Sequence, residues 1–216
     1  MRDFRGCLSL IIAVINILEI SGHGMLMEPV NRLSAWRYGF DTPINYNDNA
    51  NFCGGWATQH QLNGGKCGPC GDNYLDKQPR NSENTGFYGS GTIVRNYTEG
   101  QVLKAIVRIT ANHRGYFTFA LCPLAKSSDI ETEECFDHHP IFTADGQSKY
   151  ILPRYDNDDY AVELVLPEGL TCQHCALRWH YTTGNNWGIC ENGNGALGCG
   201  AQENFRTCSD IAIHAR

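Results

Sequence analysis

Short apolar stretches alternate along the chain with polar segments rich in glycine, asparagine and proline. Five of these stretches contain the β-branched and aromatic residues that strands favour. They are residues 103–110, 116–121, 160–166, 177–181 and 211–214. No window keeps a helical period for more than a turn or two. The pattern predicts an all-β fold, an immunoglobulin/fibronectin-like antiparallel β-sandwich with long disulfide-stapled loops.

Residues 45–91 depart from this pattern, because glycine pairs and a Gly-Pro step break any regular element there. A loop region of this length within a compact domain usually serves a function. Its three cysteines are expected to hold it in shape. The sequence contains no internal repeat or low-complexity tail and predicts no appended binding module.

The beginning of the chain is different again, because two arginines within the first five residues precede an apolar run over residues 7–18. Gly22 ends the short segment that follows this run, and it is small enough for a signal peptidase to cleave after it. A membrane anchor is the competing interpretation, but the run is shorter than the roughly 20 residues that a spanning helix needs. We therefore expect residues 1–22 to be a signal peptide, and the protein to be secreted, extracellular and without a membrane span.

Cleavage after Gly22 would make His23 the first residue of a single domain, residues 23–216, which is long enough for one sizeable core. A histidine in that place offers two metal-binding nitrogens, the free α-amino group and the imidazole. Cleavage after Ser21 or Gly24 would remove this chelating site, and both cuts remain alternatives.

The cysteine count agrees with secretion. Of the 11 cysteines, Cys7 lies in the predicted signal peptide, and the even number that remains predicts five disulfides in an oxidising compartment. Cys122 and Cys135 are close enough in sequence to staple one local loop. A zinc site built from Cys67-Gly-Pro-Cys70 and Cys172-Gln-His-Cys175 is the alternative.

The charge balance narrows the choice of partner. The formal net charge is −6, the sequence pI is about 5.7, and no run of basic residues stands out. A nucleic-acid partner therefore has no electrostatic basis, and an acidic surface with aromatic side chains suits a neutral partner. The triplet Asn96-Tyr97-Thr98 predicts N-glycosylation on a surface loop.

A second histidine completes a candidate metal site. His113 lies in a predicted turn between the strands at residues 103–110 and 116–121, which would hold its imidazole at the rim of a sheet. Together with His23 it would give three nitrogens in a T shape, an arrangement that suits copper in both oxidation states. A solvated turn histidine is the alternative for His113 taken alone.

Three segments carry a resemblance to a known family: HGMLMEPVNR at residues 23–32, residues 110–119, and GCGAQENFRTCSDIAI at residues 198–213. They resemble the lytic polysaccharide monooxygenases of auxiliary activity family fifteen along the whole predicted mature chain. The resemblance implies a β-sandwich with one copper ion on a flat face, bound by His23 and His113 in a "histidine brace".

The same resemblance assigns roles to neighbouring residues. Phe205 matches the axial aromatic position, where some members have a tyrosine, and phenylalanine cannot ligate the metal. Ala111 matches the small residue beside the open coordination position. If residues 202–206 are extended, Glu203 shares a face with Phe205 and could reach the reacting oxygen, with Gln202 as its rival. A solvated surface carboxylate is the alternative for Glu203.

The family resemblance also implies a substrate and a reaction. Copper reduced by an external electron donor would use O2 or H2O2 to oxidise C1 or C4 of a sugar in chitin and, in some members, cellulose. Such insoluble polysaccharides present C–H faces that stack on exposed aromatic rings, and Tyr46 is the predicted contact. We expect a monomer with no nucleic-acid partner.

Two other functional classes remain open at this stage. One is a non-catalytic chitin-binding or copper-binding secreted protein. The weaker one is a glycoside hydrolase, because Asp156, Asp158 and Asp159 cluster without an interpretable acid/base spacing. The remaining histidines carry no supporting context and are expected to be solvated or structural: His60, His138, His139, His174, His180 and His214.

Overall fold

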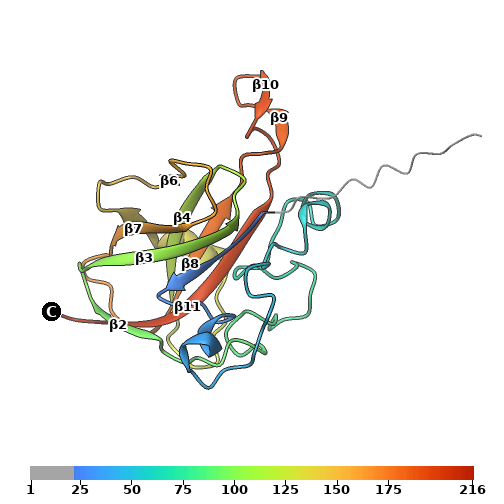
Figure 1. Ribbon diagram of the computed structural model, residues 1–216. Helices are drawn as coiled ribbons and strands as arrows, with labels where there is room; N and C mark the ends of the chain where they lie inside the picture. The colour runs from blue at the N-terminus through green and yellow to red at the C-terminus, as the bar shows by residue number, and fades with distance from the viewer. Residues whose placement is uncertain (1–21) are drawn as a thin grey trace, which may run out of the picture.

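A computed structural model describes residues 22–216, so the predicted signal peptide except Gly22 lies outside the described residues. The described chain forms a nine-stranded sheet that curls into two layers (Figure 1). One layer contains β1 (His23–Glu28), β3 (Val102–Ala111) and β7 (Asp159–Val165). The other contains β4 (Tyr116–Pro123), β8 (Cys172–Thr182), β11 (Asn204–His214) and β2 (Arg95–Thr98).

Strand β5 (Pro140–Thr143) joins the layers, because it pairs with β7 in one and with β4 in the other. The short β6 (Tyr150–Ile151) pairs with β4. Neighbouring strands run antiparallel except β2, which is parallel to β11. The predicted all-β sandwich is therefore confirmed, with one parallel edge pairing that the sequence pattern did not indicate.

The interior follows from alternation along the strands. In β3, Leu103, Ala105, Val107 and Ile109 are buried, while the side chains between them are exposed or half-buried. Strand β7 alternates in the same way. Since side chains of a strand point to opposite faces in turn, these residues form the inner face of their layer. They pack on Phe117, Trp179 and other apolar residues of the facing layer.

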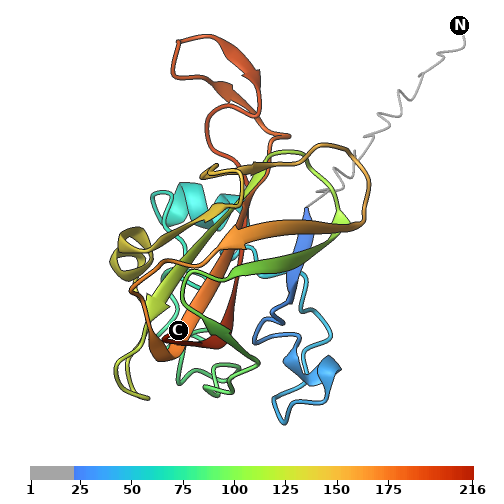
Figure 2. The same cartoon turned by 90° about the vertical axis from the view of Figure 1, so that its left-hand side faces the viewer.

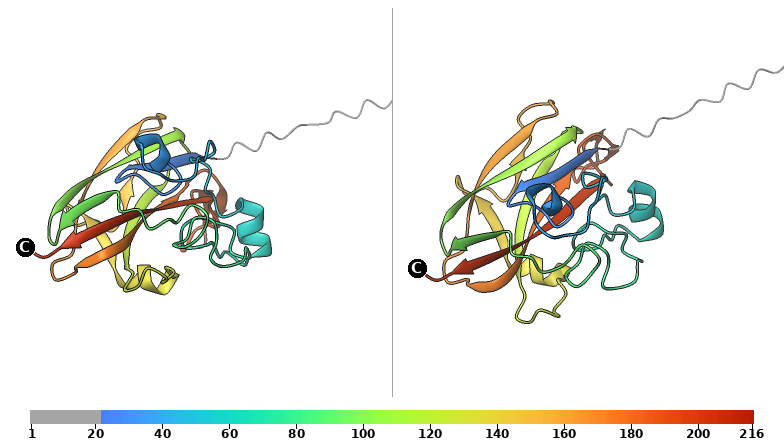
Figure 3. Two further views of the ribbon diagram at one scale, coloured as in Figure 1. Left: turned by 90° about the horizontal axis from the view of Figure 1, so that it is seen from below. Right: turned by 60° about the horizontal axis from the view of Figure 1, so that its bottom comes forward.

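Strand β11 is buried on both faces, because the loop region 45–91 covers its outer side. Figure 3 shows this loop region beside the sandwich rather than within it. Its only regular elements are the π-helical turn η2 (Thr58–Leu62) and one isolated bridge, between Asn84 and Gly89. The other helices of the described chain are equally short: η1 (Ala35–Tyr38) and α1 (Glu133–His138).

All ten cysteines of the described chain form disulfides. The pairs are Cys53–Cys67, Cys70–Cys208, Cys122–Cys135, Cys172–Cys175 and Cys190–Cys199. The local staple at Cys122 is confirmed. The zinc alternative is wrong, because Cys67 and Cys70 bond to different partners and Cys172 bonds to Cys175.

The five predicted strands are all present, although β8 and β11 begin well before the predicted residues. Strands β1, β2, β5, β6, β9 (Trp187–Ile189) and β10 (Gly195–Leu197) were not predicted, since most are too short for alternation to stand out. In the part of the chain that the structure describes, no helix is long and apolar enough to cross a membrane.

Candidate metal centre

The pairing of β1 with β3 brings the two predicted ligand histidines to one end of the sandwich. His23, the first residue of β1, lies opposite Ala111, the last residue of β3. His113 follows Ala111 by two residues in the loop that leads to β4. Residues separated by about 90 positions in sequence thus meet because of strand register.

The His113 loop is held from several sides. The His113 backbone N–H donates to the Tyr181 hydroxyl at 3.0 Å, and its carbonyl accepts from the Gly184 N–H at 2.8 Å. The ring nitrogen Nδ1 lies 2.9 Å from the Asn185 side-chain amide. The histidine is 8% exposed, so it is a positioned side chain rather than a solvated turn residue.

The start of β11 supplies the other two predicted residues. The Phe205 ring is fully buried, 6.1 Å from the His23 ring and stacked on Tyr181 at 5.9 Å between ring centroids. The Glu203 carboxylate is also buried, with Oε2 3.9 Å from His113 Nδ1. His23, His113, Glu203 and Phe205 therefore converge, as the sequence predicted.

Gly22 lies at the point where these side chains meet. Its backbone N–H donates to Glu203 Oε2 at 2.9 Å. A Cβ atom placed on Gly22 would lie 3.1 Å from Phe205 Cε2, 3.3 Å from His113 Nδ1 and 3.4 Å from Glu203 Oε2. The main chain of the residue before His23 thus fills the space that the four side chains border.

The electrostatics of this space favour the neutral form of the His113 imidazole. Burial lowers the pKa of His113, and the neighbouring His23 lowers it further. The neutral ring is the form that ligates a metal ion, because a protonated nitrogen has no lone pair to donate. The imidazole rings of His23 and His113 are nitrogen donors of the kind that copper accepts.

Two residues named from the sequence, Gln202 and Tyr46, lie elsewhere or play another part. Gln202 Oε1 accepts from the Asn186 N–H, and Nε2 donates to the carbonyls of Asn186 and Cys199. Gln202 therefore clamps the base of the β9–β10 hairpin and does not compete with Glu203. Tyr46 is 80% exposed and packs edge-on against Trp36, with ring centroids 5.3 Å apart, outside the cluster of the four side chains.

Most of the other histidines have structural hydrogen-bond partners. His60 bonds to the Gln202 carbonyl, His174 to Asp210, His180 to Asn204 and His214 to Asn96. His138 is exposed at the end of α1. The described geometry brings none of these to His23 or His113.

A projecting hairpin near the cluster was missed by the sequence reasoning. Strands β9 and β10 extend beyond the end of the sandwich (Figures 1 and 2) and are closed by the Cys190–Cys199 disulfide. Trp187, Ile189 and Leu197 are 66%, 58% and 62% exposed. The available signal was a pair of cysteines nine positions apart that enclose a glycine- and asparagine-rich segment and directly follow Trp187-Gly-Ile189.

The sequence profile of a family described as "Lytic polysaccharide mono-oxygenase, cellulose-degrading" matches residues 23–211. The chain belongs to the lytic polysaccharide monooxygenases. The solved structure of "Lytic Polysaccharide Monooxygenase AA15 from Thermobia domestica in the Cu(I) State" is 43% identical, with a TM-score of 0.87. The match covers 89% of this chain and 99% of that one. The predicted resemblance to auxiliary activity family fifteen is thereby confirmed.

A more distant structure agrees in fold. The monooxygenase superposes on an AA10 lytic polysaccharide monooxygenase from Streptomyces lividans with a TM-score of 0.54 and 17% identity, over 88% of this chain and 99% of that one. No match was found among curated protein sequences. Family membership identifies the protein as a copper-dependent monooxygenase that cleaves polysaccharides oxidatively. The hydrolase and the purely binding alternatives are therefore not supported.

Proposed function

We propose that removal of residues 1–22 converts the cluster around His23 into a single-copper centre. The ligands would be the His23 α-amino nitrogen, the His23 imidazole and the His113 imidazole. The observation that carries this proposal is the register of β1 on β3, which brings the first residue of the predicted mature chain beside the His113 loop. Copper would supply the redox chemistry that oxidises C1 or C4 of a sugar, using O2 or H2O2 and an external electron donor.

The position of Gly22 supports both the cut and the site. While Gly22 is attached, the His23 nitrogen is an amide and the Gly22 main chain occupies the space between His113, Glu203 and Phe205. An amide nitrogen is a poor ligand, because its lone pair is delocalised into the carbonyl. Cleavage after Gly22 would free the amine and open that space in a single step.

Two further side chains have proposed roles. Phe205 would limit access to the ion by bulk without ligating it, because its ring is buried against His23 and carries no donor atom. Glu203 already accepts a hydrogen bond from the Gly22 N–H, which lies between its carboxylate and His113. In the mature enzyme, that carboxylate would accept a hydrogen bond or hold a proton at the same place.

The substrate is proposed to be chitin, with cellulose as the second candidate, and Tyr46 is kept as a proposed aromatic contact because it is exposed. The enzyme is proposed to act outside the cell as a monomer. Five disulfides support an oxidising compartment. Asn96 is exposed, which supports the proposed glycosylation.

The test compares protein that starts at His23 with a matched variant that starts at Gly22. Calorimetry should give tight binding of one copper ion to the first and at least roughly 100-fold weaker binding to the second, since the amine and the space are both lost. Mass spectrometry after incubation with ascorbate on chitin and on cellulose should detect oxidised oligosaccharides only for the first. Equal copper affinity and equal product yield for both forms would refute the terminal-amine site.

The two readouts separate two kinds of failure. Tight copper binding without oxidised products on either polymer would leave a copper-binding protein rather than an oxidase of these substrates. N-terminal sequencing of the secreted protein tests the cut itself, because a start at any residue other than His23 contradicts it.

A further inference from the structure

The loop that carries His113 also presents an exposed cation beside an exposed aromatic ring. Arg114 follows His113 directly, and its guanidinium lies 4.3 Å from the centroid of the Tyr155 ring. Tyr155 is 67% exposed. A cation over an aromatic face orients both side chains. The pair forms a polar and apolar surface next to one of the two histidines of the site.

The backbone at Arg114 adopts a conformation that an arginine adopts less easily than a glycine. Its φ angle is 61°, in the left-handed region that glycine adopts most easily. Non-glycine residues in this region carry strain, and such strain is concentrated at functional positions. The conformation is held by a 2.8 Å hydrogen bond from the Arg114 N–H to Asn112 Oδ1. Arginine here therefore has a backbone cost that glycine would avoid.

Asn112 also ties the Tyr155 loop to the His113 loop. Its backbone N–H donates to Asn157 Oδ1 at 2.8 Å, and its side-chain amide donates to the Asp156 carbonyl at 3.0 Å and the Tyr160 hydroxyl at 2.9 Å. The loop between β6 and β7 lies at the same end of the sandwich as the β9–β10 hairpin (Figure 2). Tyr155 is thus fixed relative to His113 although it belongs to another loop.

The charges nearby leave the arginine available to a neutral ligand. Asp156 and Asp158 both pair with Arg154, and Asp159 pairs with Arg108. Within residues 22–216, Arg114 forms no ion pair, and its described partner is the Tyr155 ring. Guanidinium donors that are not neutralised by a carboxylate can bond hydroxyl and carbonyl oxygens.

We infer that Arg114 and Tyr155 form a contact surface for a pyranose chain beside the metal centre. The Tyr155 ring would lie against the C–H face of a sugar. Arg114 would donate to an oxygen of the same chain, a hydroxyl in cellulose or an N-acetyl carbonyl in chitin. This inference rests on the proposed function, because the sugar to be oxidised must lie at the His113 end of the molecule.

The test is binding of copper-free protein, starting at His23, to suspended chitin and to microcrystalline cellulose, measured as depletion from the supernatant. Tyr155→Ala and Arg114→Gly should each weaken binding to at least one polymer by about 3- to 10-fold. Tyr155→Phe keeps the ring and should bind within about 2-fold of wild type. A larger loss for Arg114→Gly on chitin than on cellulose would identify the N-acetyl carbonyl as the acceptor.

Two controls separate binding from folding. Arg114→Gly places glycine at a left-handed position, so its melting temperature should equal or exceed that of wild type. Phe87 is 64% exposed and packs on Tyr88, and Tyr88 lines a cavity together with Asp210. Asp210 and Phe205 are about 17 Å apart along β11, so Phe87 lies near the opposite end of this strand from the metal site. Phe87→Ala removes an equally exposed ring far from the site and should leave polymer binding unchanged.

The inference is overturned if Tyr155→Ala and Arg114→Gly bind both polymers as wild type does, or if wild type binds neither. Copper affinity is measured on the same variants and should stay within about 2-fold of wild type, since neither side chain is a proposed ligand. If the wild-type protein does not bind copper, the proposed function is contradicted. The effects of the two substitutions on polymer binding would still test the Arg114 and Tyr155 contact independently.

Discussion

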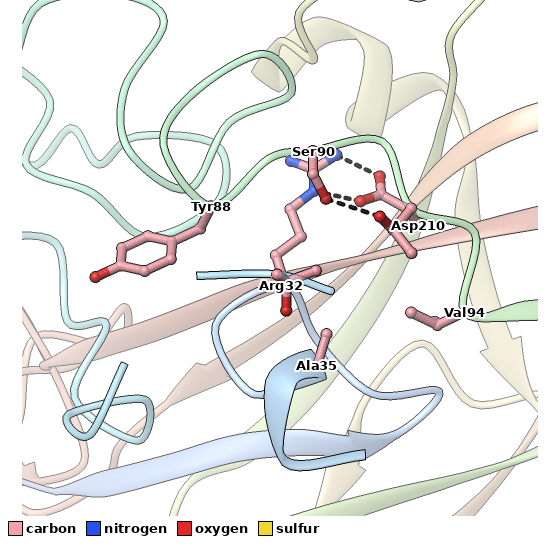
Figure 4. Close-up of a pocket in the computed structure, with 8 residues that line it drawn as sticks. Arg32, Ala35, Tyr88, Ser90, Val94 and Asp210 are labelled. Carbon is pink, nitrogen blue, oxygen red and sulfur yellow. Dashed lines mark hydrogen bonds and ion pairs between the residues drawn. The ribbon is translucent and has the colours of Figure 1, made fainter. Parts of the chain in front are cut away.

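Strand β11 connects two buried polar clusters that differ in how their charges are matched. Near its far end, Asp210 accepts a bidentate pair from Arg32 at 2.6 and 2.8 Å and a third bond from His174 at 2.7 Å. Arg32 also bonds Glu131 and the Ser82 carbonyl. Figure 4 shows Arg32 and Asp210 joined by hydrogen bonds in the lining of a small cavity. Here each charge meets an opposite charge of this chain.

At the start of the same strand, the groups instead surround a shared space. Glu203 and Phe205 face His23 and His113, and the main chain of Gly22 lies between them. Burial and the proximity of the His23 imidazole lower the pKa of His113, so the neutral form of the His113 ring is favoured. A closed ion cluster stabilises the fold, whereas the groups around Gly22 are arranged as the proposed copper site requires.

The largest expected effect is on stability at the Asp210 cluster. Asp210→Ala removes the bidentate carboxylate partner of buried Arg32 and the partner of His174, and it should cost roughly 3–5 kcal/mol in the free energy of unfolding. Urea unfolding measures this loss. The copper affinity of the folded variant should stay within about 2-fold of wild type. A parallel loss of copper affinity would mean that the two ends of β11 are coupled, and the distinction between a stabilising cluster and a separate ligand site would be wrong.

The next largest effect is on copper affinity at the His113 end of the molecule, with a smaller effect on stability. His113→Ala removes one of three proposed nitrogen ligands and should weaken copper binding by at least about 100-fold, equivalent to roughly 2.7 kcal/mol. Its free energy of unfolding should fall by less than the Asp210→Ala value, because His113 lies in a loop at the rim of the sandwich. Calorimetry and urea unfolding on the same preparation check both statements. Unchanged copper affinity would remove His113 from the site.

The smallest effect concerns pH. Burial opposes ionisation of Asp210, but Arg32 and His174 outweigh it and lower its pKa to about 2, against 3.8 for the ordinary side chain. A depressed pKa stabilises the fold above the unfolded value, and this contribution disappears as pH falls through the folded value. At 1.36 kcal/mol per pKa unit, the contribution is about 2 kcal/mol, lost between about pH 4 and pH 2.

The measurement is the free energy of unfolding between pH 6 and pH 2 for wild type and for Asp210→Asn. The difference between the two should shrink by about 2 kcal/mol across the acid range. Asp72 changes with the opposite sign, because burial raises its pKa to about 6, and subtraction of the two curves removes its contribution. A constant difference would show that Asp210 does not carry the acid sensitivity.

Much of the fold and the core of the candidate site could be predicted from the sequence. Alternation along β3 and β7 is a local property, because each residue's face depends only on its position along the strand. His23 and His113 were found from a predicted cleavage site and a predicted turn, and family motifs added Glu203 and Phe205. The structure brings all four together.

Only the tertiary structure decided the pairings over long sequence distances. Arg32 and Asp210 are 178 residues apart, and Cys70 and Cys208 are 138 apart, so no local pattern connects them. Side-chain partners such as Asn185 on His113 depend on how loops meet at a sheet end. Local alternation determined which residues face inward. Strand register and loop packing, which depend on contacts between distant segments, determined which of them touch.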